Sequence, residues 1–181
     1  KMECQQSRTY ANLQNAYELE LMQSTVYSIY GDIARQSGYQ EIGFIYDTFQ
    51  RYNKEHARIW LRHMNEGILP NIQEVLSASA RIENYKGNQL YREYASIARE
   101  EGYLELEALF NGIANIDLNH ALQFERNYNN VVRDQVFCKS QPQLWICMQC
   151  GNIMNGLCAP EICPVCGFPQ AYYRLYNVER L

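Results

Sequence analysis

Three absences narrow the class of this protein. No apolar run approaches the roughly 20 residues that a helix needs to cross a bilayer, and the polar residues 1–8 hold no signal-peptide core. Basic residues are not in excess: 16 Lys and Arg stand against 20 Asp and Glu, for a net charge of −4. Such a balance favours neither nucleic acid nor an acidic membrane surface as a partner. We therefore expect a soluble, cytoplasmic protein that binds neither.

Helix-breaking residues are scarce over most of the chain. Between about residues 9 and 132, Pro70 is the only proline. Apolar residues recur there at intervals of three and four, which is the period of amphipathic helices. Four long helices predict a mainly α protein with a four-helix bundle over residues 1–138. The expected helices cover about 9–36, 40–66, 74–100 and 103–131.

The composition changes after Cys138. Residues 139–143 are polar and predict a linker, and residues 144–181 are rich in Cys, Pro and Gly, with little helical periodicity. A second domain of about 38 residues cannot bury much apolar surface by itself. We expect a bound metal to hold it together.

Four of the seven cysteines form two Cys-x-x-Cys pairs, each followed by glycine and separated by 12 residues. Each pair directs two thiolates at one point, and the glycine lets the backbone turn around the sulfurs. The predicted site is tetrahedral and suits iron or zinc. Closed coordination leaves no position for substrate, so the domain carries electrons (iron) or holds structure (zinc). The predicted ligands are Cys147, Cys150, Cys163 and Cys166.

Other residues near these pairs have expected structural roles. Trp145 and the pair Tyr172 and Tyr173 are expected to pack over the cysteine turns. The remaining cysteines have no paired spacing, and we interpret them as incidental thiols rather than as disulfide partners. They are Cys4, Cys138 and Cys158.

The helical region contains an internal repeat. Residues 37–57 align without gaps on residues 101–121, and Gly38 and His56 meet Gly102 and His120. This pattern indicates duplication of a helix pair.

The repeat carries candidate metal ligands. Dimetal helix bundles use one Glu on each of two helices and a Glu-x-x-His motif on each of the other two. Asp117 and His120 fit the second motif with Asp in place of Glu, whereas the equivalent of Asp117 next to His56 is Asn53. The single-Glu helices supply Glu20 and Glu83.

These motifs resemble the rubrerythrin family over about residues 9–175. The resemblance rests on the cysteine domain with Ala159-Pro160-Glu161, and on the helical segments Glu83-Asn84-Tyr85, Arg99 to Tyr103 and His56-Ala57. It implies a ferritin-like di-iron bundle joined to a rubredoxin-like iron site. It also implies NADH-linked peroxide reduction, with a redox partner protein supplying electrons through the cysteine iron.

The resemblance also assigns residues, and two positions depart from it. Glu20, His56, Glu83 and His120 match family ligands, and Asp117 matches a bridging carboxylate. Asn53 stands where the other bridging Glu is expected, and Lys86 stands where the family has a second Glu. Tyr27 and Tyr91 match tyrosines near the cavity, as proton donors or as core residues.

The two departures remove negative charge from the expected di-iron site. An amide is a weak neutral ligand, and an ammonium repels a cation. Our hypothesis is that Lys86 pairs with Glu20 or Glu83, and that the bundle holds one iron or other divalent metal at Glu83, Asp117 and His120, or none. In the alternative, Lys86 extends outward and a weakened dimetal site survives.

The short connection near Pro70 bears on assembly. It cannot run the length of the bundle, so either the third helix starts later, near Ser77 or Ser79, or two chains exchange helix pairs. We expect a homodimer. The leading interpretation is an electron-transfer protein with a degraded peroxide-reducing centre, and the alternative is a non-catalytic protein with zinc at the cysteines.

Overall fold

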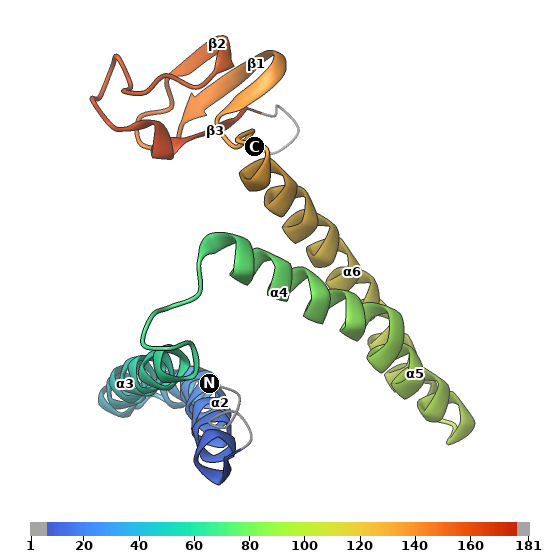
Figure 1. Ribbon diagram of the computed structural model, residues 1–181. Helices are drawn as coiled ribbons and strands as arrows, with labels where there is room; N and C mark the ends of the chain where they lie inside the picture. The colour runs from blue at the N-terminus through green and yellow to red at the C-terminus, as the bar shows by residue number, and fades with distance from the viewer. Residues whose placement is uncertain (1–6, 177–181) are drawn as a thin grey trace. The chain divides into compact units, whose positions relative to one another are not determined.

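The computed structural model describes residues 7–176, which divide into two compact units between Asn71 and Ile72 (Figure 1). Helices make up the first unit and most of the second, and a small three-stranded sheet ends the chain. The expected fold class is confirmed: mainly α, with ferritin-like helices followed by a small rubredoxin-like domain. No helix among the described residues has the length and apolarity needed to cross a membrane.

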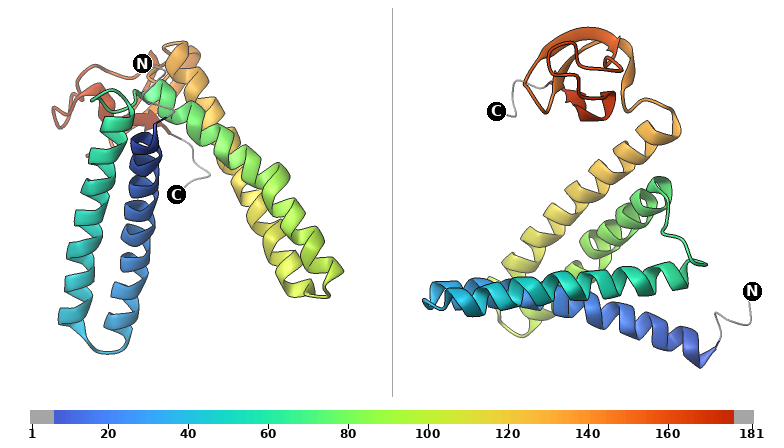
Figure 2. Two further views of the ribbon diagram at one scale, coloured as in Figure 1. Left: turned by 60° about the horizontal axis from the view of Figure 1, so that its bottom comes forward. Right: turned by 90° about the vertical axis from the view of Figure 1, so that its left-hand side faces the viewer.

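The first unit is an antiparallel hairpin of α2 (Arg8–Gln36) and α3 (Gln40–Met64), seen side by side in Figure 2. Ser7 caps α2 by accepting a hydrogen bond from the backbone N–H of Tyr10 at 3.1 Å. Small residues set the separation of the two helices: a Cβ on Gly43 would lie 3.2 Å from the carbonyl oxygen of Gly31. The hairpin turns at Gly38, whose positive φ of 86° favours glycine.

The second unit begins with a helical hairpin whose first arm has three parts. These are α4 (Ile72–Tyr85), the π-helical turn η1 (Lys86–Leu90) and α5 (Tyr91–Glu100). The second arm is α6 (Leu104–Val132). Because α4 starts at Ile72, close to the expected residue 74, the alternative of a later start near Ser77 or Ser79 is wrong.

The two hairpins repeat each other in detail. Gly102 has a φ of 85°, matching Gly38, and both loops close with the same backbone hydrogen bonds. Aromatic contacts repeat as well. Tyr27 and Tyr30 contact Tyr46 in the first hairpin, and their equivalents Tyr91 and Tyr94 contact Phe110 in the second. The duplication predicted from residues 37–57 therefore extends back at least to Tyr27.

The π-helical turn η1 marks where the repeat slips by one residue. Glu20 lies 15 residues before Arg35, whereas Glu83 lies 16 residues before the equivalent Arg99. A π-turn accommodates one additional residue within a helix. The extra residue lies in η1, just after Glu83, and Lys86 is its first residue. Residues 74–100 were predicted to form one regular helix, without this turn.

The chain ends in a sheet of order β2-β1-β3, with all pairs antiparallel. Its strands are β1 (Cys138–Cys147), β2 (Ile153–Cys158) and β3 (Tyr173–Leu175), and the short 3-10 helix η2 (Gln170–Tyr172) precedes β3. Residues 139–143, predicted to be a linker, lie within β1.

One prediction about cysteines is wrong. Cys138 and Cys158, interpreted as incidental thiols, form a disulfide between the start of β1 and the end of β2. Cys4 lies outside the described residues.

Candidate metal centres

The four predicted cysteines come together at one end of the sheet. Cys147 lies 3.7 Å from Cys166 between sulfur atoms, and Cys150 lies 3.7 Å from Cys163. A tetrahedron with metal–sulfur bonds of about 2.3 Å has edges of about 3.8 Å. The sulfur spacing therefore fits one tetrahedral metal ion.

Two turns of the same construction hold these sulfurs. The N–H of Gly151 donates to the carbonyl of Cys147 at 2.8 Å, and that of Gly167 donates to Cys163 at 2.9 Å. Both glycines have positive φ, 78° and 74°, as their place after each pair predicted.

Aromatic residues enclose one side of the cysteine site. Trp145 is fully buried and donates from its indole N–H to the carbonyl of Gly156 at 3.0 Å. Tyr173 is buried in the same core as Cys147 and Cys163, whereas Tyr172 is exposed and contacts Phe168 edge-on. The expected packing holds for Trp145 and Tyr173.

The Tyr173 hydroxyl also affects the thiol chemistry. The hydroxyl is buried, and its distance and angle to the described residues do not meet those of an ordinary hydrogen bond. It nevertheless interacts with the Cys163 sulfur strongly enough to be the largest cause that lowers the pKa of that thiol to about 6. The same interaction, with burial, raises the pKa of Tyr173 to about 12. Cys163 is thus available as a thiolate, the form that binds metal, at neutral pH.

The second unit contains a cluster of carboxylates and histidine between α4 and α6. Glu83, Asp117 and His120 each offer a ligand atom, and these atoms lie within 4.8 Å of one another. His120 Nδ1 lies 3.5 Å from Glu83 Oε2 and 3.9 Å from Asp117 Oδ1. The Asp117 side chain is only 7% exposed, so its charge requires a cationic partner.

Lys86 supplies that partner. Its Nζ lies 3.0 Å from Glu83 Oε1 and 3.2 Å from Asp117 Oδ2. Burial acts to lower the pKa of Lys86, but the hydrogen bonds with the two carboxylates outweigh it and raise the pKa above its usual value. The ammonium therefore stays charged between the carboxylates. Lys86 therefore points toward the carboxylates and not into solvent. Survival of a weakened dimetal site, the other part of the alternative in which Lys86 extends outward, stays a prediction.

The Glu83–Asp117–His120 cluster offers ligand atoms for a divalent ion beside Lys86. Glu83 Oε2 and Asp117 Oδ2 are buried without a hydrogen-bond partner among the described residues, and Glu83 Oε2 lies 3.5 Å from His120 Nδ1. Two carboxylates and one imidazole can ligate a metal ion, and the Lys86 ammonium lies against one oxygen of each carboxylate.

Gly87 brings α6 close to this cluster. A Cβ at Gly87 would lie 2.7 Å from Leu118 Cγ and 2.8 Å from the carbonyl oxygen of Ala114. Arg92 Nε donates to the carbonyl of Gly87 at 3.1 Å, and its two terminal nitrogens donate to Asn111 and Asn115. Neither Gly87 nor Arg92 was predicted as part of this site. Asn111 and Asn115, four residues apart on one helix, could have indicated a shared partner.

The first unit holds the other predicted ligands. His56 Nδ1 lies 3.3 Å from Glu20 Oε1, joining α3 to α2. Asn53 lines the same surface hollow as Glu20 and His56. The α2–α3 hairpin therefore presents one carboxylate, one imidazole and one neutral amide.

The tyrosine candidates lie in the aromatic contacts described above. Tyr27 has its ring centroid 5.6 Å from that of Tyr46, and Tyr91 stacks on Phe110 at 6.0 Å. These contacts give both residues a packing role. A role in proton donation stays a prediction.

A four-thiol site on a short sheet, preceded by two helical hairpins with carboxylate–histidine clusters, defines a metalloprotein with a rubredoxin-like domain. Residues 145–174 match the family model described as rubrerythrin, rubredoxin-like domain. The rubrerythrin of Nitratidesulfovibrio vulgaris is 30% identical, covering 96% of each chain. Rubrerythrin-1 of Clostridium acetobutylicum is 28% identical, over 94% of this chain and 95% of its own.

The chain belongs to the rubrerythrin family and carries a rubredoxin-like site of four cysteines. A solved structure of nigerythrin in a mixed-valence state is also similar, with 21% identity over 94% of this chain and 87% of that chain, and a TM-score of 0.36.

Proposed function

We propose that this protein transfers single electrons through iron at its four cysteines, and that its helical site has lost the capacity for a metal pair. Lys86 carries this proposal, because its ammonium lies 3.0 Å and 3.2 Å from carboxylate oxygens that a second metal would need. Peroxide reduction, which the family resemblance implies, is then weak or lost.

Iron bound by four thiolates supplies a one-electron couple without an open coordination position. The protein residues determine access to it. Trp145 and Tyr173 keep water from one side, whereas Cys150 is exposed on the other. The apolar side chains of Met148 and Val165, within the two Cys-x-x-Cys pairs, are 56% and 69% exposed. We infer that a redox partner protein docks on this edge of the site.

The small number of carboxylates in the two helical hairpins argues against a metal pair there. Glu83 and Asp117 together carry two negative charges, and Lys86 neutralises one of them. Asn53 adds none to the hollow that Glu20 and His56 line. Two divalent ions need several carboxylates, and this set leaves at most one metal at Glu83, Asp117 and His120.

We also propose a homodimer with exchanged helix pairs. Residues 65–71 connect α3 to α4 and span at most about 25 Å when extended. Helix α3, with 25 residues, is about 38 Å long, so the connection cannot return along it. Each hairpin exposes large apolar side chains, such as Phe44 (72%) on α3 and Leu122 (63%) on α6.

Light scattering coupled to size exclusion tests the dimer. The expected mass is twice the 21.2 kDa of one chain. A monomeric mass at micromolar concentration would refute the proposal.

The helical site is tested with the double variant Asn53→Glu, Lys86→Glu. Restoring two carboxylates should add one bound iron per chain and increase peroxide turnover. Lys54→Glu controls for the charge change of Lys86→Glu alone, because Lys54 is exposed and the two substitutions change charge by the same amount. No gain of iron in the double variant, or an equal gain in the control, would contradict the proposal.

Zinc at the cysteines is the alternative, because four thiolates suit zinc equally well. Iron colours the purified protein red, and a reductant bleaches it. Colourless protein with one zinc per chain would favour a structural role for this domain.

A further inference from the structure

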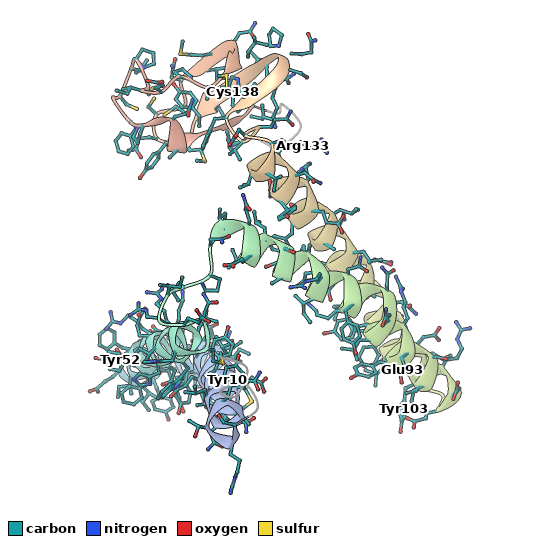
Figure 3. All side chains as sticks on the ribbon, in the orientation of Figure 1. Tyr10, Tyr52, Glu93, Tyr103, Arg133 and Cys138 are labelled. Atoms are coloured by element: carbon teal, nitrogen blue, oxygen red, sulfur yellow. A yellow bond between two sulfur atoms is a disulfide. The ribbon has the colours of Figure 1, made fainter. Side chains whose placement is uncertain are left out.

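The disulfide between Cys138 and Cys158 lies outside both metal clusters. It joins residues 20 apart in sequence, at the point labelled Cys138 in Figure 3. Cys158 is exposed and Cys138 is half-buried, so reagents in solution can reach the bond. Neither cysteine belongs to the four thiols of the predicted metal site.

This bond anchors a part of β1 that has little other pairing with β2. Cys138 is opposite Cys158, and the ladder resumes only at Gln143 opposite Gly156, with a register shift between them. Beside the bond, the N–H of Ala159 donates to the carbonyl of Phe137 at 2.8 Å. Residues 139–142 therefore depend on the disulfide for their attachment to β2.

The anchor is also connected to the cysteine core. Ala159 is buried beside Cys147 and Cys163, and Phe137 packs against the same core. Both are direct chain neighbours of the disulfide. On the other side, Lys139 donates to the side-chain oxygen of Asn130 in the last turn of α6 and to the carbonyl of Gln135, just after that helix. A change at the disulfide thus acts on the junction between α6 and the sheet.

We propose that Cys138 and Cys158 are a reversible thiol-oxidation site, oxidised by peroxide and reduced by a dithiol, that clamps the start of β1. An accessible disulfide in a reducing compartment is usually transient, catalytic or redox-sensing. This proposal does not rest on the chemistry of either metal cluster.

The oxidation balances with hydrogen peroxide. The exposed Cys158 thiolate attacks one peroxide oxygen, the O–O bond breaks, and a sulfenic acid and hydroxide form. The Cys138 thiol then displaces the sulfenic oxygen, and hydroxide takes up the released proton. In sum, two thiols lose two electrons and two protons, one S–S bond forms, and one peroxide becomes two waters. A dithiol reverses this by exchange and is itself oxidised to a disulfide.

The test uses the zinc-loaded full chain with Cys4→Ser, so that the metal is redox-silent and no other free thiol remains. The protein is reduced with dithiothreitol, treated with one equivalent of peroxide, alkylated and digested with trypsin. Cleavage after Lys139 places Cys138 and Cys158 in different peptides, so the bond appears as a cross-linked pair. We expect the cross-link to form with peroxide and to disappear with dithiothreitol in the folded protein.

Amide hydrogen exchange measures how firmly the disulfide holds the start of β1. Oxidation should slow exchange at residues 139–142, and Cys158→Ser should exchange at the reduced rate under both conditions. The proposal is overturned if peroxide forms no cross-link, or if dithiothreitol cannot reduce it without unfolding. Equal exchange rates at residues 139–142 in the oxidised and reduced protein would contradict the proposed effect on β1.

Discussion

At the Glu83–Asp117–His120 cluster, the ammonium of Lys86 lies between two carboxylates at 3.0 Å and 3.2 Å. Its position matters more than its charge alone, because an exposed lysine near the cluster would only weakly oppose a metal. With Asp117 almost buried, the ion pair replaces hydration that the carboxylate loses. Lys86 thus serves as an internal cation at this site.

Replacing Lys86 with Met tests this role. Without metal, the two carboxylates lose their cation, and we expect a loss of about 1–3 kcal/mol in the free energy of unfolding. Added divalent metal should bind more tightly than in the unmodified protein and restore stability. Urea unfolding with and without zinc measures both effects. The exposed Lys54→Met is the control, and an equal loss in that variant would contradict the assignment.

The pH dependence of this difference has a definite sign. Pairing raises the pKa of Lys86 above the ordinary lysine value of 10.5. Its stabilisation is therefore present below pH 10.5 and is lost as the pH rises through the raised value. The stability difference between the protein and Lys86→Met should persist from neutral pH to about 10 and shrink above 10.5.

The roles of individual residues could be predicted where they depended on short sequence motifs. The paired cysteines, the glycines after them and the inward pairing of Lys86 all follow from local motifs and charge. The Cys138–Cys158 bond does not, because its partners have no motif and meet only through the strand register of β1 and β2.

At the scale of elements, the first helix was predicted almost to its ends, since no proline interrupts it and Gly38 follows it. The π-turn η1 was not, because the apolar pattern does not distinguish one extra residue within a helix from a regular one. The turn matters for the site. Compared with the first hairpin, it places Glu83 one residue further in sequence from Tyr91 and from the loop at Gly102.

Two glycines test how closely α6 approaches η1. A Cβ at Gly87 would collide with Leu118 and Ala114, whereas a Cβ at Gly112 would meet nothing within 4 Å. Gly87→Ala should lower the free energy of unfolding by about 1–3 kcal/mol. Gly112→Ala should raise it by about 0.5–1 kcal/mol, because alanine favours the helix. Chemical denaturation of both variants measures this contrast, and equal effects would contradict the close contact at Gly87.

At the scale of the whole molecule, the chain combines parts that are stabilised differently. The helical hairpins pack through long interfaces and aromatic contacts, whereas the sheet has a core of only a few buried residues, two of which are cysteines of the metal site. Small domains of this kind depend on their metal for folding.

Metal removal should therefore act on one part of the chain. With a strong chelator and reductant, we expect the sheet to lose its amide protection and Trp145 to become exposed, while the helical circular dichroism largely remains. Retained burial of Trp145 in metal-free protein, read from its fluorescence, would contradict the dependence on metal.

The number of metal ions bound by the helical hairpins tests most directly the claim that Lys86 leaves no place for a metal pair. Anomalous diffraction at the iron edge, from crystals of protein produced with iron, locates each ion. We predict one peak among the four cysteines and at most one beside Asp117 and His120. Two closely spaced peaks in the helical region, lined by Glu83, Asp117 and His120, would contradict the account.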